Sequence, residues 1–168
     1  MRRMKFLYAS GLVVLAGSFM PFAKGASDHE RINQFKAAYV FKMARFVDWG
    51  SDDTEIKLCM APGVALERYQ SSLNNRPLDN NRTLRTSVEA LNPSCHLYFG
   101  PTDANVSIPP STLAIGDHQD TLQNGGHIEL FLEEGRLQFR MNKAEIKLRA
   151  REGDFRVSSK LMRLARRT

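Results

Sequence analysis

The N-terminal segment of the chain has the order of a secretory signal peptide, and this limits what the remainder can fold into. A basic head, Met1–Lys5, precedes an uncharged and mostly apolar run, Phe6–Met20. Pro21 ends this run, and small residues then lead to a predicted cleavage site after Gly25. The alternative, a membrane anchor, requires about 20 apolar residues, which is more than this run offers. The sequence therefore predicts that residues 26–168 fold outside the cytoplasm, where disulfides persist.

The charge of the predicted mature domain is nearly balanced overall and uneven along the chain. Residues 26–168 are enough for one domain with its own core, and they carry 20 basic and 18 acidic side chains. This balance argues against a basic nucleic-acid-binding domain. Residues 26–134 carry a net charge of −6 and residues 135–168 a net charge of +8. The basic end can attract an acidic partner or a membrane surface, or the two parts can neutralise each other in the folded domain.

Cys59 and Cys95 are the two cysteines of the chain. An even number of cysteines in an exported domain indicates a disulfide. A bridge here would close a loop of about 36 residues and contribute roughly 3–4 kcal/mol. A metal pair and a redox pair are the alternatives, but neither cysteine has neighbouring zinc ligands and there is no C-x-x-C motif. The sequence favours a structural bridge between Cys59 and Cys95.

A helix predicted over 30–47 is the clearest element of the sequence. Its large apolar residues recur at steps of three and four: Ile32, Phe35, Tyr39, Met43 and Phe46. Ser27 or Asp28 can cap its start, and the charged, glycine-containing sequence 48–51 ends it. The spacing predicts that this aromatic stripe faces the core rather than a ligand.

The rest of the sequence alternates short apolar runs with turns. It predicts strands over 56–60, 83–88, 95–99, 112–115, 127–132 and 137–141. A second helix is predicted over 64–73, a hairpin loop at 133–136 and a terminal helix after Ser158. Residues 144–150 alternate like a strand but are mostly good helix formers, and we expect a helix there.

This order of elements predicts an α/β fold class. We expect a single compact domain with a mainly parallel sheet of five to six strands and helices on both faces. An antiparallel hairpin and a terminal helix are expected at the C-terminal end.

The sequence contains none of the motifs that bind nucleotides, activate a serine or hold zinc. The most polar segment holds Asp117, His118 and, after Gly125-Gly126, His127. These side chains can bind a small anion or a metal ion, or they can stabilise turns, and the sequence favours turns. We therefore predict no catalytic residue, metal or cofactor, which favours a binding or regulatory module over an enzyme.

Several short motifs occur in an order that resembles a known family. They are Phe46-Val47-x-Trp49, Leu58-Cys59, Cys95-x-Leu97-x-Phe99, Ile115-Gly116-Asp117, Gly125-Gly126-x-Ile128, Arg136-Leu137-x-Phe139 and Ser158-Ser159-Lys160-Leu161-Met162-x-Leu164-Ala165-Arg166. Together they span the predicted mature chain, and they resemble the YfiR-like periplasmic proteins. The resemblance implies that Cys59 and Cys95 form the long-range disulfide of that family. A second cysteine pair known in the family is absent from this chain.

The resemblance implies a non-enzymatic regulator located in the periplasm. The best-known member binds the periplasmic region of an inner-membrane diguanylate cyclase and holds that enzyme inactive, which lowers cyclic-di-GMP and biofilm formation. The resemblance further implies an outer-membrane lipoprotein as a second partner, a homodimeric state and a response to the redox state of cysteines.

Contact residues for such a partner are predicted on two surfaces: the exterior of the 30–47 helix, and the basic face of Lys160, Arg163 and Arg166. Three other functions are weighed against this one. A polar pocket at 117–127 would make the domain a small-ligand sensor without a cyclase partner, and a cysteine of low pKa would make it a thiol enzyme. Nucleic-acid binding through the basic end conflicts with export, and we predict none.

Overall fold

The computed structural model describes residues 27–50, 53–152 and 155–166. The strands of its main sheet are β2 (Glu55–Met60), β3 (Arg76–Pro77), β4 (Thr83–Val88), β5 (Leu97–Phe99), β6 (Leu113–Gly116), β7 (Ile128–Glu133) and β8 (Arg136–Met141). They lie in the order β3-β4-β2-β5-β6-β7-β8. The five central strands run parallel, and the edge strands β3 and β8 are antiparallel to their neighbours. The predicted α/β class and C-terminal hairpin are confirmed, and the two-residue β3 adds a seventh strand.

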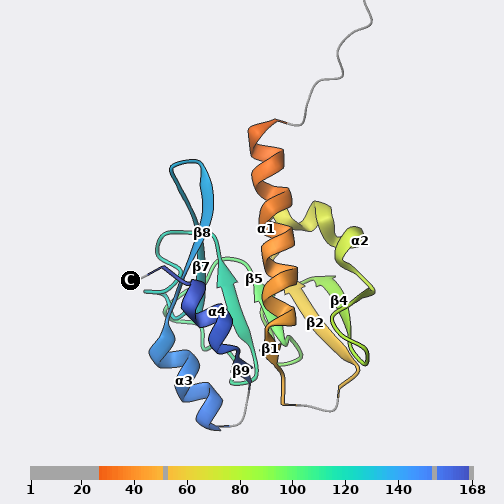
Figure 1. Ribbon diagram of the computed structural model, residues 1–168, viewed down its shortest axis with the longest axis vertical. Helices are drawn as coiled ribbons and strands as arrows, with labels where there is room; N and C mark the ends of the chain where they lie inside the picture. The colour runs from red at the N-terminus through yellow and green to blue at the C-terminus, as the bar shows by residue number, and fades with distance from the viewer. Residues whose placement is uncertain (1–26, 51–52, 153–154, 167–168) are drawn as a thin grey trace, which may run out of the picture.

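Helix α1 (Asp28–Arg45) begins at Ser27, whose hydroxyl oxygen accepts a hydrogen bond from an amide of the first turn at 3.3 Å. It runs along the front of the sheet in Figure 1. Its buried residues are Ala37, Val40, Phe41, Met43 and Ala44. The prediction that the aromatic stripe faces the core is wrong for Phe35, which is 53% exposed, and Tyr39 and Phe46 are only half-buried. The helix turns its alanine-containing face to the sheet instead, because small side chains allow the two backbones to approach closely.

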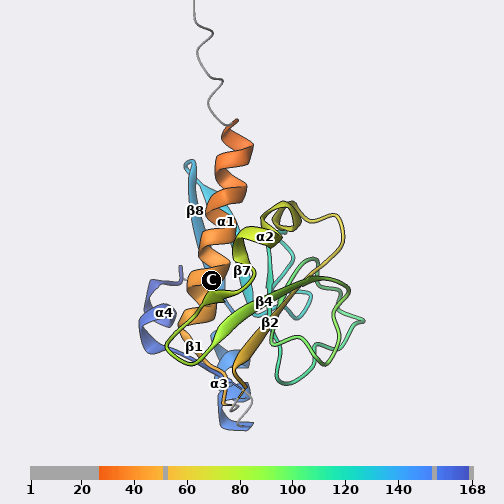
Figure 2. The same ribbon diagram turned by 90° about the vertical axis from the view of Figure 1, so that its right-hand side faces the viewer.

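The two faces of the sheet are covered differently. One face packs against α1, the 3₁₀ helix η1 (Ala65–Tyr69), α2 (Gln70–Leu73), α3 (Lys143–Glu152) and α4 (Ser159–Leu164), which all contribute to its core. The other face carries a smaller cluster from strands and loops: Cys59, Ala61, Cys95, Tyr98, Ile108 and Ala114. Figure 2 shows these loops on the side away from α1 and α4.

The predicted flanking of the sheet by helices is confirmed, but the buried cluster on the second face comes from strands and loops and not from helices as expected. The connections from β4 to β5 and from β5 to β6 contain prolines: Pro93, Pro101, Pro109 and Pro110. Proline lacks the amide proton that a helix interior needs, so these connections cross the sheet as irregular loops.

The C-terminal part contains the two expected helices, α3 and α4 after its cap Ser158, and one strand pair that was not expected. Helix α3 confirms the expectation for 144–150, and Asn142 caps it with its side-chain oxygen at 3.1 Å from an amide of the first turn. A small antiparallel sheet then pairs β1 (Val47–Asp48) with β9 (Arg156–Val157). This small sheet joins the end of α1 to the start of α4.

Part of each edge of the main sheet is covered, at β4 beyond the two-residue β3 and at β8. At β4, the side chains of Asn74 and Gln70 bond the backbone of Thr86 at 3.0 Å and 3.3 Å. At β8, two outward-facing carbonyls accept hydrogen bonds, one from the Tyr39 hydroxyl at 3.2 Å and one from the Arg166 amide at 2.9 Å. Within the residues that the structure describes, no helix is both long and apolar enough to cross a bilayer.

Candidate functional site

A groove of about 300 Å³ lies between α1, the edge strand β8 and α4. Its lining residues are Tyr39, Lys42, Met43, Phe46, Gln138, Phe139, Leu161 and Leu164. Met43, Phe139 and Leu161 are at most 6% exposed and form its floor, whereas Leu164 is 60% exposed. The Tyr39 ring packs edge-on against Phe139, with 6.4 Å between ring centroids. The groove thus combines a buried apolar floor with exposed apolar walls.

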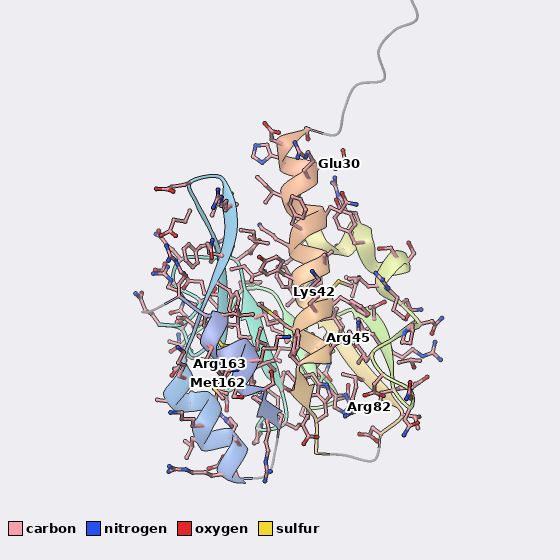
Figure 3. All side chains as sticks on the ribbon, viewed as in Figure 1. Glu30, Lys42, Arg45, Arg82, Met162 and Arg163 are labelled. Carbon is pink, nitrogen blue, oxygen red and sulfur yellow. A yellow bond between two sulfur atoms is a disulfide. The ribbon has the colours of Figure 1, made fainter. Side chains whose placement is uncertain are left out.

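Two of the predicted partner-contact residues, Lys160 and Arg163, lie on α4 beside this groove. The Lys160 ammonium is 5.7 Å from the centre of the Phe46 ring, which is within reach of a cation–π contact. Lys42, which sequence reasoning did not single out, lines the groove from the α1 side. In Figure 3, the labelled Lys42 and Arg163 lie on α1 and α4, on the face turned toward the viewer. We call the exposed residues Lys42, Lys160 and Arg163 the groove cations.

Arg166, the third predicted contact residue, is bound within the domain. Its guanidinium pairs with the Glu133 carboxylate at the end of β7, with Nε 3.1 Å from Oε2. Its amide donates to the Phe139 carbonyl. Arg166 therefore holds the C-terminal segment on β8 and is less available to a partner than Lys160 and Arg163 are.

The structure contains the predicted disulfide between Cys59 of β2 and Cys95. Both residues are buried on the loop-covered face of the sheet. The Glu89 carboxylate lies 3.3 Å from the Cys59 sulfur and pairs with Lys57 at 2.7 Å. Hydrogen bonds from Lys57 and Ser87 lower the pKa of Glu89. Because the two sulfurs are bonded to each other, this Cys–Cys–Glu group offers no thiolate to a metal ion.

The polar residues Asp117, His118 and His127 do not form one cluster. Asp117 follows β6 and pairs with Lys36 of α1 at 2.7 Å. His127 precedes β7, and because β6 and β7 run parallel, it lies toward the opposite end of that strand pair. The His118 carbonyl accepts a hydrogen bond from the Thr121 hydroxyl at 2.7 Å. A ligand-binding role for this segment stays a prediction.

His96 and His127 make the same pair of backbone contacts just before β5 and β7. The backbone amide of each histidine donates a hydrogen bond to the carbonyl of one residue on the neighbouring strand. The backbone amide of that strand residue donates in turn to Nδ1 of the histidine ring. The partners are Lys57 for His96, at an Nδ1 distance of 3.1 Å, and Ala114 for His127, at 2.9 Å. A row of rings joins the two histidines along this end of the sheet: His96, Trp49, Phe155 and His127.

His127 is fully buried, and its Nε2 has no hydrogen-bond partner among the described residues. Burial, with a smaller contribution from the Arg149 charge and against the opposing Glu145 charge, lowers the pKa of His127 to about 4. The ring is therefore neutral at neutral pH, as its acceptor role at Nδ1 requires. No sequence motif marks either histidine contact, because the contacts depend on strand register.

One family model matches most of the chain. It is the model described as YfiR/HmsC-like, and it covers residues 33–166. The chain belongs to the YfiR/HmsC-like family. Members of this family are known as periplasmic regulators of diguanylate cyclases. No curated protein matches the chain. The matched region of this YfiR/HmsC-like domain includes the disulfide and every residue that lines the groove.

Two glycines of the YfiR/HmsC-like domain make room for one buried threonine. A Cβ added at Gly116 would clash with the Thr121 hydroxyl oxygen and lie 2.8 Å from its methyl carbon. A Cβ added at Gly126 would lie 2.5 Å from the same methyl carbon. Gly116 in the motif Ile115-Gly116-Asp117 and Gly126 in the motif Gly125-Gly126 therefore allow the loop after β6 to pack around Thr121.

Replacing Gly116 with alanine is expected to lower the free energy of unfolding by about 1–3 kcal/mol, the usual range for overpacking. Urea denaturation of the exported protein measures this loss. In a Thr121→Ala background the same Gly116→Ala change should cost much less, because the clashing side-chain atoms are gone. Equal losses in both backgrounds would contradict the packing explanation.

Proposed function

We propose that this protein is exported to the periplasm, is cleaved after Gly25, and represses an inner-membrane diguanylate cyclase or a related membrane sensor. It does so by binding the periplasmic domain of that protein, and it thereby lowers cyclic-di-GMP synthesis. Membership of the YfiR/HmsC-like family is the observation that carries this proposal, because members are known as periplasmic regulators of diguanylate cyclases. The protein acts by contact rather than by catalysis.

Repression of this kind requires that the protein bind the inactive state of the cyclase more tightly than the active state. Each tenfold preference for the inactive state corresponds to about 1.4 kcal/mol of bias. The contact surface proposed here comprises the groove flank of α1 together with Lys160 and Arg163 of α4. An outer-membrane lipoprotein that competes for the repressor would release the cyclase. Homodimerisation would place two such surfaces in one particle.

Deleting the gene is expected to raise intracellular cyclic-di-GMP, because the cyclase loses its repressor. The full-length chain supplied in trans should restore the original level. The same chain without residues 1–25 should not restore it, because that chain stays on the cytoplasmic side of the membrane. Mass spectrometry of the periplasmic fraction checks that the exported form begins at Ala26. An unchanged nucleotide level on deletion, or restoration by the leaderless chain, would contradict the proposal.

A small-ligand sensor is the second candidate function, and one cavity favours it. A pocket of about 340 Å³ lies between the Gly125 turn and α3. Its polar lining includes Asn124 and Asn142, and also Glu145 and Arg149, which pair at 2.9 Å. This volume is at the lower end of the range for small-molecule pockets. Thermal-shift screening of the exported protein against small metabolites would distinguish this function from repression by protein contact alone.

A further inference from the structure

We propose that the groove between α1, β8 and α4 binds an acidic segment of the partner protein, one that carries large apolar side chains next to carboxylates. This inference rests on the proposed function and adds to it the surface and the chemistry of the contact. Three properties of the groove carry it: the exposed apolar walls, the uncompensated positive rim and the buried floor.

The apolar walls of the groove are continuous with an exposed aromatic flank of α1. Leu164 on α4 is strongly exposed, as is Phe35, which lies one helical turn before Tyr39. Tyr39 and Phe46 are half-buried along the same flank. Single exposed apolar residues are common, but Tyr39, Phe46 and Leu164 all line the same concave surface. Removal of apolar area from water contributes about 25 cal/mol per Å², so a segment that fills the groove is stabilised there.

The groove cations have no carboxylate within 4.0 Å in the part of the chain that the structure describes. Three other cations pair with carboxylates of the domain: Lys36 with Asp117, Arg140 with Glu129 and Arg166 with Glu133. The carboxylates that complement Lys42, Lys160 and Arg163 are therefore expected on the partner. A second copy of this chain would bring the same cations to the contact, which argues against self-association through the groove.

A protein segment fits this surface better than an anionic membrane does. The floor residues Met43, Phe139 and Leu161 are buried, so they are reached only by a side chain that enters the groove. A flat bilayer would contact the rim alone. The volume of about 300 Å³ is that of a small binding pocket, which suits a few anchoring side chains.

A fluorescently labelled synthetic helical peptide, with leucines along one face and glutamates on both flanks, tests the proposal by fluorescence anisotropy. The exported wild-type protein is expected to bind it. The double variant Lys42→Glu/Arg163→Glu is expected to bind at least tenfold more weakly, because both new carboxylates repel the glutamates. The matched control Lys147→Glu reverses an exposed cation on α3, outside the groove, and should bind like the wild type.

A second peptide, with lysines in place of the glutamates, keeps the test decisive if the double variant is destabilised. This peptide should bind the double variant more tightly than the wild type. Such a result is possible only if the double variant is folded and its groove charge is reversed. Equal affinity of the wild type and the double variant for the glutamate peptide would overturn the proposal. Binding to vesicles of phosphatidylethanolamine and phosphatidylglycerol without peptide binding would assign the surface to membranes instead. A dimer that Leu164→Asp dissociates would assign it to self-association.

Failure of this inference is separable from failure of the proposed function. If gene deletion raises cyclic-di-GMP and the double variant restores repression as fully as the wild type, the groove assignment is wrong and the regulatory function stands. If deletion has no effect while peptide binding follows the groove charges, the groove assignment stands and the regulatory function is wrong.

Discussion

Replacing both Cys59 and Cys95 with serine is expected to lower the free energy of unfolding of the oxidised protein by about 3–4 kcal/mol. The bond joins positions that are 36 residues apart, so its loss gives the unfolded chain many more conformations. Both positions are buried, so the serine hydroxyls also enter an apolar cluster. Urea denaturation followed by circular dichroism measures the loss.

Two controls separate the covalent bond from the side chains at Cys59 and Cys95. A reducing agent should bring the wild type toward the stability of the double variant and leave the double variant unchanged. The alanine double variant removes the same bond without placing hydroxyls in the cluster, and it should lose a similar amount. If the serine variant is destabilised and the alanine variant is not, the loss comes from buried hydroxyls and the bridge is not the stabilising element.

The protein is expected to lose about 3 kcal/mol of stability at His127 as the pH falls from 6.5 to 4. In the unfolded chain this histidine has its ordinary pKa of 6.5, whereas burial lowers the folded pKa to about 4. Between these values the unfolded chain binds a proton that the folded domain does not, so acid favours unfolding. Above pH 6.5 both states are neutral at His127 and its contribution is constant, and below pH 4 the loss is complete.

Urea denaturation at pH 7 and at pH 4 gives the loss of unfolding free energy on acidification for each protein. The effect of His127 is the difference in this loss between the wild type and a variant. His127→Asn keeps a side-chain oxygen that can accept the Ala114 amide proton, and it should show a smaller acid loss than the wild type. The matched control His29→Gln removes an exposed histidine of α1 and should keep the full acid loss. Carboxylates titrate alike in all three proteins, so equal acid losses in the wild type and His127→Asn would show that His127 does not titrate as inferred.

The order of elements could be predicted because most of them leave a periodic signal. The orientation of α1 could not, because two apolar stripes lie on that helix. One holds the large residues Phe35, Tyr39 and Phe46, and the other holds Ala37 and Ala44. Periodicity identifies an amphipathic helix but not which of two overlapping stripes a sheet accepts. The pairing of β1 with β9 was also missed, because a strand of two residues is too short to show a period.

The candidate site was predictable only in part. The disulfide followed from the cysteine count and the predicted export, and Lys160 and Arg163 followed from the basic face of the terminal helix. Lys42 could not be identified as a groove residue from the sequence, because an exposed lysine is common on the outer surface of a helix. Its place in the groove depends on the position of α4 in the folded domain. The groove forms where α1, β8 and α4 pack together, and a local sequence pattern does not predict which distant elements pack together.

The partly covered edges of the main sheet bear on how this protein behaves at high concentration. A sheet whose outermost strands present free amides and carbonyls recruits strands from other molecules and can grow into fibrous aggregates. Here Asn74 and Gln70 occupy the backbone of β4, and Tyr39 and Arg166 occupy that of β8. Strand addition by another copy at these positions would require those hydrogen bonds to break first.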